Sequence, residues 1–231
     1  MISVIIPLYN NKKTIEKTVK SILSQTYRNL EIIMVDDASD DGGAENIKKF
    51  NGRIKVFYGD GHHGANWARN FGARRAEGNC LFFCDADVIL KKNALEILKK
   101  TLDKNKNASF AYSSFKLGWK KFISQPFDAE ALRRQSYIST MSLISRKDFP
   151  GFDEHLEKFQ DWDLWLTILK RGGVGVFVPE ILFYAKPSRR GKSKWFPSFF
   201  YKIPWNKLGI KIKALEEYDN ALKKIEVKHG L

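Results

Sequence analysis

Two stretches of the sequence decide the fold: Leu30-Glu-Ile-Ile-Met-Val-Asp36-Asp37 and Cys80-Leu-Phe-Phe-Cys-Asp85-Ala-Asp87. Each is an apolar run that stops at carboxylates, the pattern of a buried parallel strand whose C-terminal end opens into a cleft. α/β proteins bind their ligands at that edge. The stretches therefore predict a parallel sheet with an acidic ligand site. The simpler alternative is that aspartates end these strands because they favour turns.

The second stretch also predicts a metal site. Asp85 and Asp87 alternate with Ala86, so in an extended segment both carboxylates point to one side. Two hard oxygen donors suit Mg²⁺ or Mn²⁺, and such an ion commonly also binds a diphosphate.

The rest of the first half alternates between strand and helix periodicity. Strands are expected at 3–7, 30–35, 54–58 and 80–84, and helices at 12–25, 43–50, 65–76 and 93–103. This order predicts a single Rossmann-like α/β domain with a mostly parallel central sheet flanked by helices. The second half is more mixed, with strands expected at 109–114 and 174–184 and a helix at 161–171.

A composition break at Lys186-Pro-Ser-Arg-Arg-Gly-Lys-Ser divides the chain into an α/β domain, 1–186, and an extension, 187–231. The extension is predicted to hold a basic loop, an aromatic segment from Trp195 to Trp205 and an amphipathic helix at 207–228. Its excess of basic residues suits an anionic membrane surface. The alternative, that the extension caps the domain, stays open.

The location is expected to be cytoplasmic, with peripheral association on the inner face of the cytoplasmic membrane as an open alternative. Cys80 and Cys84 lie too far apart along one strand for a disulfide, and reduced cysteines fit the cytosol. No apolar run approaches the roughly 20 residues of a membrane span, and no signal peptide is recognised. The net charge is +14, but no nucleic-acid-binding module is recognised, so nucleic acid is not expected as a partner.

Gly59-Asp-Gly61-His-His-Gly64 matches the G-x-G-x-x-G pattern of dinucleotide-binding proteins. It follows the third expected strand instead of the first, and bulky side chains come directly after it, so we do not interpret it as a dinucleotide site. The adjacent His62 and His63 are expected to be solvated instead of binding a metal.

A third acidic group, Gln160-Asp161-Trp162-Asp163, opens the helix expected at 161–171. Carboxylates at this place either stabilise the helix N-terminus or provide a general base beside a bound hydroxyl. The spacing alone does not decide between the two.

Six motifs in order together resemble glycosyltransferase family 2, with its GT-A fold, over about residues 1–172. They are Val4-Ile-Ile-Pro7-Leu-Tyr9-Asn10, Ser24-Gln25-Thr26-Tyr27, Val35-Asp36-Asp37-Ala-Ser39-Asp40, Ala68-Arg69-Asn70, Asp85-Ala-Asp87, and Gly151-Phe-Asp153-Glu154 with Asp161-Trp-Asp-Leu-Trp. The resemblance implies an inverting transferase that uses a nucleotide-diphosphate sugar and a divalent metal, Mn²⁺ or Mg²⁺. We expect a UDP-sugar donor and a lipid-linked or cell-envelope glycan as acceptor.

The resemblance also implies roles for single residues. Pro7, Tyr9 and Asp37 would hold the nucleobase, and Arg69 would lie in the same nucleotide pocket. Asp85 would lie near the ribose and sugar, and Asp87, together with Asp85, would bind the metal. Asp161 would be the catalytic base.

Three departures from the family pattern matter. Gln160 stands where the family usually has Glu, although Asp163 is a possible substitute, and Val88 stands where a third acidic residue is common. Thr167 replaces a frequent Arg, and the Gln-x-x-Arg-Trp signature of processive synthases is absent, so transfer of single sugars is expected.

Two other functions are compatible with such a domain. A sugar nucleotidyltransferase normally needs a glycine-rich loop after the first strand, and Leu8-Tyr-Asn-Asn-Lys12 contains no glycine. A nucleotide-sugar-binding protein without transfer activity would need no base at Asp161. Arg189, Arg190 and Lys192 are either a basic lid over the diphosphate or a solvated linker.

Overall fold

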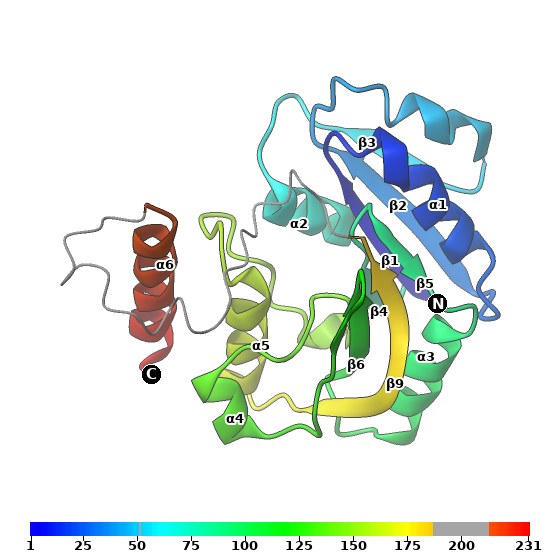
Figure 1. Ribbon diagram of the computed structural model, residues 1–231. Coiled ribbons are helices and arrows are strands. Elements are labelled where there is room, and N and C mark those ends of the chain that lie inside the picture. Colours follow the sequence, from blue (N-terminus) through cyan, green and yellow to red (C-terminus); the bar gives the residue numbers. More distant parts are fainter. Residues whose placement is uncertain (51, 187–212) are drawn as a thin grey trace.

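The computed structural model describes residues 1–50, 52–186 and 213–231. Within these residues the strands form one curled sheet with the order β3-β2-β1-β4-β8-β6-β9-β5, and β7 pairs with β6 beside this path (Figure 1). Helices cover both faces of the sheet. This is the α/β architecture that the sequence predicts.

The first half supplies the parallel part of the sheet. The strands are β1 (Ile2–Leu8), β2 (Leu30–Asp36), β3 (Lys55–Tyr58) and β4 (Cys80–Phe83). All three pairings among them are parallel. They are connected by α1 (Lys12–Leu23), the 3₁₀ helix η1 (Glu45–Phe50) and α2 (Ala65–Arg75).

The second half mixes expected elements with short ones that the sequence pattern did not reveal. The elements are β5 (Val88–Leu90), α3 (Ala94–Lys104), β6 (Phe110–Leu117), β7 (Lys120–Phe122), α4 (Ala129–Arg134), β8 (Leu143–Ser145), η2 (Arg146–Asp148), α5 (Gln160–Lys170) and β9 (Gly175–Ala185). Of these, α3, β6, α5 and β9 were expected from the sequence, and the others were not. β8 pairs antiparallel with both β4 and β6 and so joins the two halves of the sheet.

The long strand β9 bends around the second half of the sheet (Figure 1). It runs parallel to β6 and then pairs antiparallel with β5 through its last three residues. Its register against β6 shifts at Pro179 and Glu180, which have no partner in β6. Proline has no N–H to donate, so a bulge is where a strand tolerates it.

The residues of β1 alternate between two cores. Val4 and Ile6 pack with α1 and α3 on one face, whereas Ile5 packs with α2 and α5 on the other. All three are fully buried. Burial on both faces explains why the strand reads as a continuous apolar run.

The turn after β4 differs from the extended segment that we expected. β4 ends at Phe83, and Ala86 and Asp87 form a turn in which the Val88 N–H donates to the Asp85 carbonyl at 3.2 Å. Asp85 and Asp87 therefore stand on a tight turn between β4 and β5, still at the C-terminal edge of the parallel strands.

The C-terminal helix α6 (Lys213–His229) packs beside α5 (Figure 1). Leu215 and Ile225 are buried, and the ring of Tyr218 contacts that of Phe159 edge-on at 5.0 Å. The apolar face of α6 is thus used within the protein. The aromatic segment from Trp195 and the basic residues of 187–192 lie outside the described residues. No described helix is both long and apolar enough to cross a membrane.

Gly72 of α2 allows the helix to approach the sheet closely. A Cβ atom added there would lie 2.6 Å from Cγ2 of the buried Ile5 and 3.4 Å from Cγ2 of Val35. We expect Gly72→Ala to lower the free energy of unfolding by about 1–3 kcal/mol, because overpacking outweighs the helix propensity of alanine, worth about 1 kcal/mol. Urea denaturation measures this, with the exposed Arg74→Ala on the same helix as control. An equally stable Gly72→Ala protein would show that α2 has room to shift.

Candidate active site

The C-terminal ends of β1 and β2 bring Tyr9 and Asp37 together. Asp37 is 2% exposed, and its carboxylate accepts backbone N–H groups from His63 at 2.8 Å and Gly64 at 2.7 Å. Nδ1 of His62 lies 2.8 Å from the same carboxylate. The ring of Tyr9 stacks on the His62 ring with centroids 3.9 Å apart. A planar aromatic surface thus adjoins a buried acceptor.

Pro7 lies on β1 beyond the last residue that pairs with β4. Its lack of an N–H therefore leaves no gap in that ladder. The backbone nearby is unusual: Asn10 and Ala38 adopt φ angles of 50° and 60°. Left-handed conformations at non-glycine residues cost free energy and concentrate at functional sites.

Arg69 of α2 connects the acidic turn after β4 to the loop that contains Phe152. Its Nη2 donates to Oδ1 of Asp85 at 2.8 Å and its Nη1 to the side-chain oxygen of Asn66 at 3.0 Å. The guanidinium also lies over the ring of Phe152, 5.3 Å from its centroid. Its Nε is buried and has no hydrogen-bond partner among the described residues. A buried cation with an unused donor, paired with the one carboxylate of Asp85, suits an anionic ligand.

Asp85 and Asp87 offer two carboxylates, the protein ligands of a metal ion that is also bound by a substrate. Burial and the neighbouring Asp85 raise the pKa of Asp87 to about 6. A cation would relieve this unfavourable charge. The described residues contain no group of three or more His, Cys, Asp or Glu side chains that could hold a metal. One or two carboxylates completed by phosphate oxygens are a usual site for Mg²⁺, so these residues fit the ion.

Asp161 stands in the first turn of α5. It follows Phe159, whose φ of 59° turns the chain sharply into the helix. Burial raises the pKa of Asp161, although the Trp162 N–H, the charge of Arg69 and the Ser136 hydroxyl favour its ionised form. A carboxyl whose pKa is raised in this way is better matched to a general base than an ordinary aspartate.

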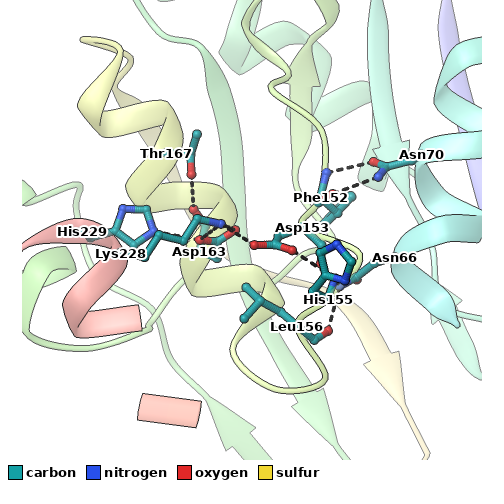
Figure 2. Close-up of polar contacts among 10 residues, drawn as sticks. All are labelled: Asn66, Asn70, Phe152, Asp153, His155, Leu156, Asp163, Thr167, Lys228 and His229. Carbon is teal, nitrogen blue, oxygen red and sulfur yellow. Dashed lines mark hydrogen bonds and ion pairs between the residues drawn. The ribbon is translucent and has the colours of Figure 1, made fainter. Parts of the chain in front are cut away.

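Two asparagines of α2 hold the loop that leads to Asp161. Asn70 donates to the Phe152 carbonyl and accepts the Phe152 N–H, both at 2.8 Å. Asn66 donates to the carbonyls of Asp153 at 2.8 Å and Leu156 at 3.0 Å. Figure 2 shows these contacts reaching from α2 across the loop. The sequence analysis did not single out Asn66, and it noted Asn70 only as part of a motif.

Asp163 has a different environment from Asp161. It is almost completely buried, and its carboxylate lies 2.8 Å from both Nζ of Lys228 and Nε2 of His229. Lys228 also bridges to Asp153 at 2.7 Å, so the end of α6 meets both α5 and the loop (Figure 2). The positive charge of Lys228 compensates Asp163. Burial, and not repulsion from Asp163, raises the pKa of Asp161. Asp163 and Lys228 are 65 residues apart in the sequence, so no local pattern indicates that they pair.

His62 and His63 were expected to be solvated, but in the structure each ring has specific partners. His62 contacts Asp37 and stacks on Tyr9. His63 pairs with Asp60 at 2.7 Å and stacks on Trp67 with centroids 4.4 Å apart. Both rings remain about 40% exposed, but each has specific partners.

A cavity of about 490 Å³ lies elsewhere, at the N-terminal ends of β2 and β3. Leu30 and Lys55, the first residues of these strands, line it. It is therefore at the opposite edge of the sheet from the acidic residues and forms no part of the candidate site.

Fold and site together define an α/β protein with an acidic ligand-binding edge, and the comparisons identify its family. The family model described as glycosyl transferase family 2 matches residues 3–159. The chain therefore belongs to glycosyl transferase family 2, as the six sequence motifs had indicated.

Relatives and solved structures agree with this assignment. The UDP-Glc:alpha-D-GlcNAc-diphosphoundecaprenol beta-1,3-glucosyltransferase WfgD of Escherichia coli is 31% identical over 184 residues, 75% of this chain and 72% of WfgD. An uncharacterised glycosyltransferase of Rickettsia conorii is 31% identical over 191 residues, and this chain spans only 31% of its length. The S. aureus TarS 1-349 structure with UDP-GlcNAc has a TM-score of 0.73 at 19% identity, covering 97% of this chain and 71% of that one.

The environments of Asp161 and Asp163 predict opposite effects on stability. Asp163→Asn leaves Lys228 and His229 without their shared anion and should lower the free energy of unfolding by about 3 kcal/mol. Asp161→Asn should leave it unchanged or raise it at pH 7. Because the pKa of Asp161 is raised in the folded protein, ionisation of Asp161 lowers the free energy of unfolding. This loss is absent below the ordinary pKa of aspartate and complete above the raised pKa.

Urea denaturation of both variants at pH 7 measures this difference. Lys228→Met is the matched control, and it should destabilise less than Asp163→Asn because His229 still pairs with Asp163. A larger loss of stability for Asp161→Asn than for Asp163→Asn would contradict the two environments described above.

Proposed function

We propose that this chain transfers a single sugar from a nucleotide-diphosphate donor to an acceptor hydroxyl, with inversion at the anomeric carbon. One observation carries the proposal. The buried Arg69 contacts Asp85 and lies close enough to Asp161 to stabilise its ionised form. A group suited to a diphosphate and a group suited to deprotonating a hydroxyl therefore adjoin each other.

The relatives support a UDP-sugar donor and a lipid-linked or cell-envelope glycan acceptor. WfgD uses UDP-Glc and acts on a GlcNAc carried by diphosphoundecaprenol. TarS has been crystallised with UDP-GlcNAc. A membrane-surface role for the extension would have to rest on residues 187–212, because the apolar face of α6 packs on the protein.

In the proposed mechanism each part of the site has one task. Tyr9 and Asp37, with Pro7 beside them, hold the nucleobase. Arg69 binds the diphosphate through its guanidinium. The carboxylate of Asp161 accepts the proton of the acceptor hydroxyl as its oxygen attacks the anomeric carbon from the face opposite the leaving diphosphate.

Asp85 and Asp87 would hold Mn²⁺ or Mg²⁺. When bound, this ion would stabilise the negative charge that develops on the departing diphosphate. Asp85 and Asp87 make this place negative, which disfavours a diphosphate on its own. The metal ion and the diphosphate are therefore expected to bind together.

A nucleotide-sugar-binding protein without transfer activity is the second candidate. Its supporting observation is Gln160, whose side chain donates to the Glu157 carbonyl at 3.0 Å and adds no second carboxylate beside Asp161. Turnover separates the two candidates: a binding protein would bind donor but neither transfer nor hydrolyse it.

Replacement of the proposed base tests the mechanism. Asp161→Asn should lower turnover of a UDP-sugar by at least the roughly 10²-fold typical of lost general-base catalysis, with donor affinity nearly unchanged. In the wild type, turnover should fall as the pH falls through the raised pKa of Asp161. Asp163→Asn, assayed below its unfolding temperature, should show the same fall of turnover at low pH. A fully active Asp161→Asn enzyme would remove Asp161 from the mechanism.

Calorimetry tests the diphosphate site separately from catalysis. UDP should bind more tightly with Mn²⁺ than without, and Asp87→Asn should abolish this metal-dependent gain while leaving the unfolding temperature close to that of the wild type. Lys55→Met, at the opposite edge of the sheet, is the control and should bind as the wild type does. Equal binding of UDP, GDP, CDP and dTDP with and without metal would refute the site assignment.

A further inference from the structure

His62 has contacts of the kind that a nucleobase would make. Its planar ring stacks on Tyr9, with centroids 3.9 Å apart and an angle of 21° between the planes. Nδ1, at one edge of the same ring, lies 2.8 Å from Oδ2 of Asp37. The ring therefore combines face-on stacking with an edge nitrogen that faces a buried carboxylate.

Asp37 restricts what can bind in this position. Its carboxylate is buried and already accepts two backbone N–H groups, from His63 and Gly64. It still has lone pairs for one further donor, and Nδ1 of His62 lies 2.8 Å from Oδ2. A heterocycle with a ring N–H, such as uracil, can supply a donor in that place. A ring nitrogen that is an acceptor, as at the same edge of cytosine, would instead face a buried anion and be rejected.

We propose that His62 occupies the nucleobase position when no donor is bound and must leave it for the donor to bind. The proposal rests on the function proposed above, in which Tyr9 and Asp37 receive the nucleobase. The nucleobase of the donor then replaces the stack of His62 on Tyr9 and its contact with Asp37 by contacts of its own. His62 thereby multiplies the intrinsic affinity for every nucleotide by the fraction of molecules in which the site is free.

The surroundings of His62 allow its ring to leave. It is 43% exposed, so one side already faces water. A Cβ added at Gly61 would meet no atom closer than Nε2 of His63 at 3.9 Å, and one added at Gly64 would meet none within 4 Å. The neighbouring His63 is held apart from the site by Asp60 and Trp67. His62 can therefore rotate away while the backbone N–H groups that bind Asp37 stay in place.

Calorimetry of UDP binding to the full chain tests the proposal. His62→Ala removes the competing ring and should bind UDP more tightly than the wild type, by on the order of fivefold. His63→Ala is the matched control, because the His63 side chain stacks on Trp67 and pairs with Asp60, and it should bind UDP within about twofold of the wild type. UDP should be preferred over CDP in all three proteins, because Asp37 is unchanged.

An independent measurement uses the unaltered protein. In NMR spectra of the wild type, the ring protons of His62 should shift when UDP is added, because they leave the face of Tyr9, and those of His63 should shift much less. Unshifted His62 signals in UDP-saturated protein would overturn the proposal. So would UDP affinity in a folded His62→Ala protein that equals or falls below that of the wild type.

The outcomes also separate this inference from the proposed function. If UDP binds the wild type and His62→Ala does not bind it more tightly, only the role of His62 is wrong. If no nucleoside diphosphate binds any of the three folded proteins, the proposed donor site fails and His62 has no nucleobase to exclude.

Discussion

The candidate site depends on one buried cation. Arg69 projects from α2, contacts Asp85 on the turn after β4, and favours the ionised form of Asp161 at the start of α5. These acidic groups come from distant parts of the sequence, and the positive charge between them offsets their mutual repulsion. The guanidinium therefore favours an acidic edge, and its Nε has no hydrogen-bond partner within residues 1–50, 52–186 and 213–231.

The same helix also fixes the loop that carries Asp161. Asn66 and Asn70 lie on either side of Arg69 in the sequence and hydrogen-bond the backbone of residues 152–156. From that loop the contacts continue to α6 through Lys228, which bridges Asp153 and Asp163. The position of the proposed base is thus determined by α2 on one side and by the C-terminal helix on the other. In this arrangement α6 is a structural part of the domain and not a free appendage.

The sequence predicted the first half of the fold well, because strands buried on both faces and amphipathic helices give strong periodic signals. Short elements escaped prediction. β5 and β8 have three residues each, and α4 has six, too few to show a period. The sequence predicts an extended segment at Asp85 and Asp87, where the structure has a turn. An Asp-x-Asp pattern occurs in extended segments and in turns and does not distinguish them.

The candidate site was predictable where it followed strands and unpredictable where it depended on distant contacts. Asp37 and Asp85 stand after apolar runs, and this position marked them as candidates. Nothing local distinguishes Asp161 from Asp163; the difference arises because Lys228 and His229 reach only the second of them. Adjacent histidines likewise give no hint that His62 faces Tyr9 while His63 faces Trp67.

The central claim is that the edge formed by Arg69, Asp85, Asp87 and Asp161 is one site for a metal-bound nucleoside diphosphate. Paramagnetic broadening tests it most directly, by NMR of the full chain with UDP and a small amount of Mn²⁺. The account predicts that amide signals of residues 68–70, 85–88 and 160–163 broaden first, and that those of Leu30 and Lys55 at the opposite edge stay sharp. Broadening centred on the opposite edge, or spread evenly over the acidic surface, would contradict it.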